Sequence, residues 1–188
     1  MFSYFGSKSK IVHLYRKPQY PLIIEPFAGS ARYAVRYYSR DVWINDADPI
    51  IYEIWKWIIN ATKSDIRALP VLKHHENISD HKWLSDAERW LLGFTVGPAS
   101  ASPHAAATRW GANDTVPRLQ SVLLKYCGKL SHWRLTNLHY SKMRNVAATW
   151  YVDPPYQIQG VHYRYSTKDI DFQHLGLWCR ERGTSYCM

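Results

Sequence analysis

Short apolar runs and a helical repeat alternate along the first third of the chain. Leu22–Ile24 and Val42–Ile44 are apolar runs of strand length, and a helix is expected between them, over about residues 30–39. Asp48 is expected to cap the next helix, because Pro49 follows at the first helical position, which proline favours. Isoleucines then recur at helical spacing and predict a broad apolar face. This order predicts the start of a nucleotide-binding α/β sheet.

The middle of the chain, residues 63–132, has a different pattern without clear strands. Ser85 and Glu88 form a capping-box pattern ahead of an apolar helical repeat. Thr115 and Pro117 open a second predicted helix. We therefore predict a mostly helical insertion. It carries many basic residues, namely Lys63, Arg67, Lys73, Lys82, Arg89, Arg109, Arg118, Lys125 and Lys129.

The strand pattern returns after the insertion. Residues 135–138 and 148–152 predict two strands, residues 172–182 a helix, and residues 184–188 the beginning of one more strand. A doubly wound sheet does not normally finish at such a point, so the sheet is expected to be truncated at its C-terminus. The predicted fold class is α/β, with a Rossmann-like doubly wound sheet and a helical insertion.

Two separated parts of the chain are expected to build the sheet domain. Residues 1–62 and residues 133–188 would form it together, and residues 63–132 would form the insertion. At 188 residues the chain has the length of one domain with a modest insertion.

Composition favours a polyanionic partner. The formal net charge is +9 and 15% of the residues are aromatic, so electrostatic attraction and stacking surfaces are both available. The three cysteines and nine histidines show no metal-ligand spacing, and no metal site is expected. Neither a signal peptide nor a membrane-spanning segment is apparent, which predicts a soluble, cytoplasmic protein.

The most specific motif is the tetrapeptide Asp153-Pro154-Pro155-Tyr156, directly after the apolar run Trp150–Val152. Average residue usage would produce it in roughly one random chain of this length in a thousand. A carboxylate and a rigid carbonyl can accept the two protons of an exocyclic amine, while an aromatic ring holds a flat base. The motif therefore indicates methylation of a nucleobase amine; the alternative is a strand that stops at a proline turn.

A second candidate site lies at the end of the first predicted strand. Gly29 lacks a side chain, so a ligand can approach the backbone closely there. Asp46 ends the next strand, where an acid can bond ribose hydroxyls. Asp46 as a simple turn residue is the structural alternative.

The ordered set of motifs resembles the DNA adenine N6-methyltransferase family that includes the DNA adenine methylases. The matching blocks are Tyr4-Phe5-Gly6-Ser7-Lys8, Glu25-Pro26-Phe27-Ala28-Gly29-Ser30-Ala31, Asn45-Asp46 and Asp153-Pro154-Pro155-Tyr156. Tyr163–Tyr165 and Phe172–Leu175 also resemble the segment that follows the last block in this family. The resemblance implies a methyltransferase-type sheet, S-adenosylmethionine as methyl donor and a target-recognition insertion.

The resemblance also implies roles for residues of the donor site. Tyr4 and Lys8 belong to its first block, and Lys8 would reach the methionine carboxylate of the donor. Glu25, Phe27 and Gly29 would line the methionine and adenosine region. Asp46 would bond the ribose, and His139 stands where related enzymes often place an acid that holds the donor's adenine. A further departure is Ala31, at a position that is often glycine in such loops.

The resemblance assigns the contacts with the target base to the last block. Asp153 and the carbonyl of Pro154 would accept the protons of the target amine, so that its lone pair can attack the methyl group in line. Tyr156 would stack on an adenine flipped out of the duplex. Within the basic insertion, Arg109, Trp110 and Arg118 are the candidate DNA contacts; a solvated helical surface is the alternative for each of them.

Several choices stay open at this level. The same amine chemistry fits cytosine N4 or an adenine of RNA, and a truncated homologue could bind DNA without catalysis. Double-stranded DNA is the expected partner, and a restriction endonuclease is a candidate partner, as in a restriction-modification system. The protein is expected to be encoded by a prokaryote or a virus. No membrane partner is expected.

Overall fold

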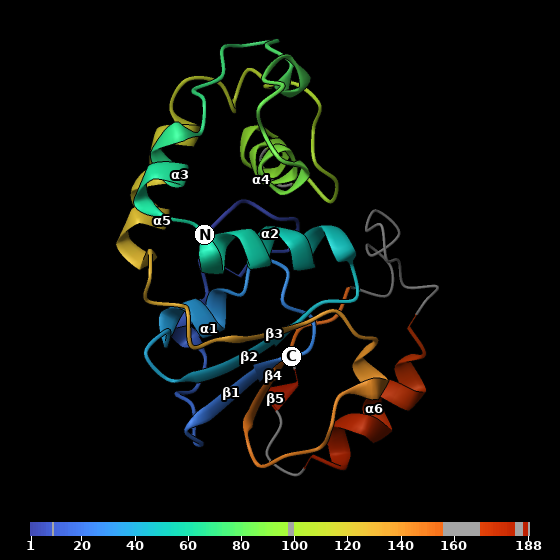
Figure 1. The fold of residues 1–188 in the computed structure, drawn as a ribbon. Coiled ribbons are helices and arrows are strands. Elements are labelled where there is room, and N and C mark those ends of the chain that lie inside the picture. The colour runs from blue at the N-terminus through green and yellow to red at the C-terminus, as the bar shows by residue number, and fades with distance from the viewer. Residues whose placement is uncertain (9, 98–99, 156–169, 183–185, 188) are drawn as a thin grey trace. The chain divides into compact units, whose positions relative to one another are not determined.

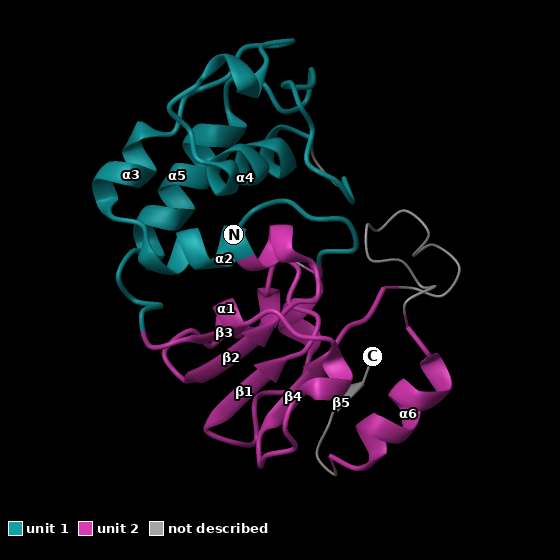
Figure 2. Ribbon diagram, turned by 45° about the vertical axis from the view of Figure 1, so that its right-hand side comes forward, with its two compact units in different colours: residues 1–7, 53–131 teal, residues 8–52, 132–188 magenta. Residues whose placement is uncertain are grey.

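The computed structural model describes residues 1–8, 10–97, 100–155, 170–182 and 186–187. Two compact units divide the chain (Figure 2). Met1–Ser7 and Glu53–Ser131 form one unit, here called the helical unit. Lys8–Tyr52 and His132–Met188 form the other, here called the sheet unit. Each unit is described by itself below.

The sheet unit is built on parallel strands (Figure 1). The strands are β1 (Leu22–Glu25), β2 (Asp41–Asn45), β3 (Arg134–Thr136), β4 (Thr149–Val152) and β5 (Tyr186–Cys187). Their order is β3-β2-β1-β4-β5, and every pairing is parallel. The chain therefore moves outward from β1 to β3, then returns to the other side of β1 as β4. This order places a reversal of direction between β1 and β4.

Helices cover both faces of the sheet. The side chains of β4 alternate, as strand geometry requires. The ring of Tyr151 stacks on Tyr33 of α1 (Arg32–Arg36), with centroids 4.7 Å apart. Trp150 points to the other face, where its ring lies edge-on to Trp178 of α6 (Phe172–Arg180), at 5.3 Å. The structure is thus a mixed α/β fold around a buried sheet.

The face under α6 holds the principal core of the sheet unit. Ile24, Trp43 and Trp150 lie next to one another in register across three strands, and all are buried. Arg182 closes this core from the end of α6. Its guanidinium lies 3.3 Å from the ring centroid of Trp178 and donates to the carbonyls of Trp178 and Met143, at 2.7 and 3.1 Å. Stacking and backbone hydrogen bonds thus accommodate a mostly buried cation.

Strands and helix ends mostly lie where the sequence pattern predicts them. Asp48 caps α2 (Pro49–Asn60) by accepting from the amide of Ile50 at 2.9 Å. The exception is the helix expected over about residues 30–39, since α1 is only five residues long. Ala31 has a left-handed backbone, with φ 44°, so the helix cannot begin before Arg32.

The helical unit contains the remaining helices, α3 (Lys63–Ala68), α4 (Asp86–Val96) and α5 (Thr115–Tyr126), and most of α2. The predicted capping box of Ser85 and Glu88 opens α4. The side-chain amide of Gln120 donates to backbone carbonyls at the end of α3, and these hydrogen bonds connect α5 to α3. Gly111 packs so closely that an added Cβ would lie 1.8 Å from the carbonyl oxygen of Val96.

Between these helices, two loop segments run antiparallel. His75 and Ala107 are joined by a backbone hydrogen bond, and an isolated bridge links Asn77 to Ala106. Across the described residues 53–97 and 100–131 there is no strand, as the sequence pattern predicts. None of the described helices is long and apolar enough to cross a membrane.

Candidate active site at the carboxyl ends of the strands

The carboxyl ends of β1, β2 and β4 carry most of the residues singled out in the sequence. In open α/β sheets, ligands bind outside these ends, where the strand order reverses. That reversal lies between β1 and β4. Glu25 ends β1, and Asp153 directly follows β4. The topology therefore brings the glycine-turn block and the Asp153 block to one edge of the sheet.

Asn45, at the end of β2, holds the loops of this edge together. Its side-chain amide donates to the carbonyls of Pro26 and Leu138, both at 2.9 Å. Its side-chain oxygen accepts from the hydroxyl of Thr136 at 2.8 Å and from the amide of Leu138 at 3.0 Å. Asn45 is completely buried and makes every hydrogen bond that its side chain offers. It therefore fixes the loops after β1 and β3 against the end of β2.

Asp46 fixes the glycine turn. One carboxylate oxygen accepts from the amide of Gly29 at 2.9 Å, and the other accepts from the amide of Asp48 at 3.0 Å. Gly29 has φ 45°, a conformation that favours glycine. Burial raises the pKa of Asp46 to about 7, although the two amides act to lower it. Each oxygen retains a second lone pair, so Asp46 can still accept a hydrogen bond from a ligand.

Glu25 has a structural partner that the sequence pattern does not reveal. Its carboxyl group is buried and accepts a hydrogen bond at 2.5 Å from the amide of Ala34, in the first turn of α1. It thereby satisfies one of the amides that a helix start leaves without an internal partner. Burial raises the pKa of Glu25 to about 8; the Ala34 amide opposes this shift and the charge of Asp153 adds to it.

Asp153 is paired with Lys8. The ammonium nitrogen lies 2.7 Å from both carboxylate oxygens of Asp153, across 145 residues of sequence. Both side chains are mostly buried, with 14% and 18% of their surface exposed. Burial raises the pKa of Asp153, while the hydrogen bond and the charge of Lys8 act to lower it. The structure thus joins the first and last motif blocks directly.

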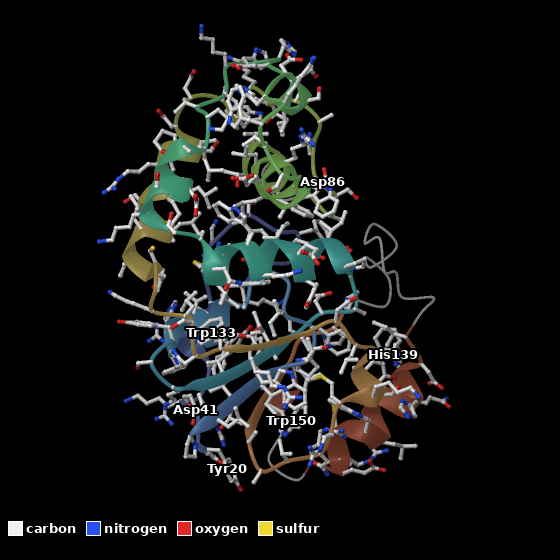
Figure 3. The ribbon with its side chains drawn as sticks, in the orientation of Figure 1. Tyr20, Asp41, Asp86, Trp133, His139 and Trp150 are labelled. Atoms are coloured by element: carbon white, nitrogen blue, oxygen red, sulfur yellow. The ribbon has the colours of Figure 1, made fainter. Side chains whose placement is uncertain are left out.

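An aromatic corner lies beside the glycine turn. The ring of Phe27 is 5.5 Å from the ring of Tyr140, which in turn lies 4.4 Å from the ring of His139. His139 is exposed, and its Nδ1 is 2.7 Å from the hydroxyl of Ser141. Figure 3 labels His139 in the sheet unit, near α6. Phe27 and His139 therefore offer a flat apolar surface and a polar ring at the same corner.

The sheet unit contains most of the candidate site residues, namely Lys8, Glu25, Phe27, Gly29, Asp46, His139, Asp153 and Pro154. Tyr4 lies in the helical unit, where its ring packs 5.4 Å from that of Phe94. Tyr156 and Tyr163–Tyr165 lie outside the described residues. The role of each candidate stays a prediction.

The candidate DNA contacts all lie in the helical unit. Trp110 is 78% exposed, and the guanidinium of Arg109 lies 5.7 Å from its ring centroid. Arg118, in the first turn of α5, forms an exposed ion pair with Asp114 at 3.5 Å. Among the described residues, no group of three or more His, Cys, Asp or Glu could hold a metal ion.

The mixed α/β fold with its parallel sheet is consistent with a methyltransferase-like fold. Residues 4–91 match the model of the D12 class N6 adenine-specific DNA methyltransferase family, which confirms the resemblance seen in the sequence. The match includes the blocks from Tyr4 to Asp46 and ends before Asp153. A search of the curated proteins found no match.

We expect Asn45→Ala to destabilise the protein by about 3 kcal/mol, because it leaves one buried and two partly buried backbone groups without their side-chain partner. Urea unfolding would measure the loss. Asn60→Ala is the matched control, since Asn60 is exposed and its side chain donates to the carbonyl of Lys56. This variant should lose no more than about 0.5 kcal/mol of unfolding free energy. Equally small losses in both variants would contradict the role given to Asn45.

Because the pKa of Glu25 is raised, the free energy of unfolding is expected to decrease as the pH rises. The contribution of Glu25 is fully present below the ordinary pKa of 4.5 and is lost as the pH rises through about 8, because the folded protein holds the proton more tightly. Glu25→Gln should flatten this decline in urea unfolding measured across that range. Glu53→Gln, at a carboxylate that is 40% exposed, should leave the pH dependence unchanged. An identical pH dependence in wild type and Glu25→Gln would refute the assignment.

Proposed function

We propose that the protein transfers a methyl group from S-adenosylmethionine to the N6 amine of an adenine flipped out of double-stranded DNA. The observation that carries the proposal is the position of Asp153. It follows β4 at the edge of the sheet where Gly29 and Asp46 also lie, and it is mostly buried. The family match over residues 4–91 supports adenine-specific DNA methylation.

The strand order supports a Rossmann-like, doubly wound arrangement for the sheet unit. Strands in the order β3-β2-β1-β4-β5 follow the usual pattern of dinucleotide-binding sheets, with α1 and α6 on opposite faces. In such sheets the ligand lies across the reversal between β1 and β4. The proposed donor and target amine would therefore meet beside Asp153.

The chemistry of the side chains at this edge fits S-adenosylmethionine. Asp46 has acceptor capacity for ribose hydroxyls, and it also holds the turn at Gly29, where a ligand can approach the backbone. Phe27 and His139 can contact the adenine ring, and Lys8 can contact a carboxylate. When bound, the donor supplies a methyl group on a positively charged sulfur.

The protein's own contribution would be to bind and orient the target amine. Asp153 would accept one amine proton, and the carbonyl of Pro154 would accept the other. Both hydrogen bonds would move the nitrogen lone pair out of conjugation with the base, so that it could form the new bond to the methyl carbon while the bond from that carbon to sulfur breaks. The surplus proton of the methylated nitrogen would then leave to water, by way of the Asp153 carboxylate. Alignment of the reactants and fixed acceptors can together supply most of the rate. Tyr156 would stack on the flipped base.

DNA binding is proposed to involve Arg109, Trp110 and Arg118. Trp110 with its neighbouring Arg109 offers a stacking surface beside a cation. The ion pair of Arg118 with Asp114 is exposed on both sides, and such pairs are worth little, so a phosphate can replace the carboxylate at small cost.

Both units have more positively than negatively charged residues. The helical unit has ten Lys and Arg residues against seven Asp and Glu, whereas the sheet unit has fourteen against eight. The sequence pattern drew attention to the basic residues of the insertion. The larger excess lies in the sheet unit, so long-range attraction of DNA is expected from both units.

We expect Asp153→Ala to abolish methyl transfer in an assay with tritiated donor, because the amine loses its charged acceptor. Donor affinity, measured by calorimetry, should change little. Asp41→Ala is the control on the same sheet, since Asp41 is exposed at the start of β2 (Figure 3). Retained activity in Asp153→Ala would exclude the proposed mechanism. Mass spectrometry of the nucleosides separates methylated adenine from methylated cytosine.

Binding to duplex DNA should weaken steeply as salt rises, because phosphate contacts release counterions. Arg109→Ala and Arg118→Ala should each reduce the slope of log affinity against log salt by about one. Arg144→Ala, at an exposed arginine of the sheet unit outside the proposed contacts, is the control and should leave the slope nearly unchanged. Fluorescence anisotropy measures these slopes. A flat salt profile in wild type would exclude phosphate contact as the basis of binding.

A further inference from the structure

Lys8 lies closer to Asp153 than its proposed contact with the donor carboxylate requires. Binding a donor carboxylate needs no contact between Lys8 and Asp153, yet the ammonium of Lys8 lies symmetrically on that residue. The nitrogen lies 2.7 Å from each carboxylate oxygen, the geometry of strong, charge-assisted hydrogen bonds. With 14% and 18% of the two side chains exposed, solvent screens the pair only weakly.

Burial opposes the ionisation of Asp153, and two neighbouring acidic groups respond to its charge. Glu25 at the end of β1 is a second buried carboxyl group, and its pKa is raised in part by the charge of Asp153. Tyr151 of β4 is a buried phenol whose pKa is also raised by Asp153, after the larger effect of its own burial. Burial raises the pKa of Asp153 itself. Against this burial, Lys8 supplies a stabilising positive charge.

We propose that Lys8 is a positioning residue for Asp153, which keeps the carboxylate ionised and fixes its plane for the incoming amine. A carboxylate has about four lone-pair positions on its two oxygens. Lys8 engages one on each oxygen, so one position on each remains for the substrate. A protonated Asp153 would have a donor where the amine needs an acceptor. This inference rests on the proposed function, because it assigns Asp153 the task of accepting an amine proton.

The role differs from donor binding in what it predicts. A lysine that only binds the donor carboxylate would, when replaced, raise the KM for the donor equally across the pH range. A lysine that keeps Asp153 ionised would, when replaced, move the acid limb of kcat to higher pH even with donor and DNA saturating. A neighbouring positive charge lowers a carboxyl pKa by roughly one to three pH units, and the acid limb should move by a similar amount.

The test compares Lys8→Met, Lys8→Arg and the control Lys10→Met, since Lys10 is exposed two residues further along. With donor and duplex DNA saturating, kcat is measured as a function of pH. Lys8→Met should have its acid limb roughly one to three pH units higher than wild type. Lys8→Arg should restore most of the wild-type profile, and Lys10→Met should match wild type. An unchanged acid limb in Lys8→Met would overturn the inference.

A second measurement needs no turnover. The carboxyl carbon of Asp153 is titrated by carbon-13 NMR in ligand-free wild type and Lys8→Met, and assigned with Asp153→Asn. The Asp153 midpoint should rise in Lys8→Met by the same amount as the acid limb, and coincident midpoints would overturn the inference. A wild-type protein that binds donor and DNA but transfers no methyl group would overturn the proposed function, while the titration would still decide whether Lys8 controls Asp153.

Discussion

One buried amide organises the working edge of the sheet unit. Asn45 donates to the carbonyls of Pro26 and Leu138 and accepts from the hydroxyl of Thr136 and the amide of Leu138, so that the loops after β1 and β3 are both held at the end of β2. The adjacent residue, Asp46, extends the arrangement to Gly29. An amide is well suited to this place, because it offers donors and acceptors without the cost of burying a charge.

Three carboxyl groups lie at the same edge of the sheet, but their hydrogen-bond partners differ. Glu25 and Asp46 are held by backbone amides, whereas Asp153 is held by a cation. Below them, the α6 face of the sheet is packed with large apolar side chains, among them Trp150 and Trp178. The sheet unit thus combines a rigid apolar base with a cluster of carboxyl groups whose protonation is sensitive to their neighbours.

The sequence could predict the features that depend on near neighbours. The strands, the capping box at Ser85 and the cap at Asp48 all follow from local patterns. The short α1 was not predictable, because the left-handed backbone of Ala31 is visible only in three dimensions. The motif blocks indicated which residues share the site. They could not show that Lys8 contacts Asp153, since no local pattern links residues 145 positions apart.

That separation also has a consequence for how the protein is made. During synthesis, Lys8 and β1 emerge early, and Glu53–Ser131 of the helical unit must follow before β4 can pair with β1. Until then, one edge of β1 lacks its neighbouring strand, and the apolar side chains of Ile23 and Ile24 lack the packing that β4 provides. Sheets that depend on such distant pairings form slowly. The nascent chain therefore needs protection from aggregation until residues beyond β4 have left the ribosome.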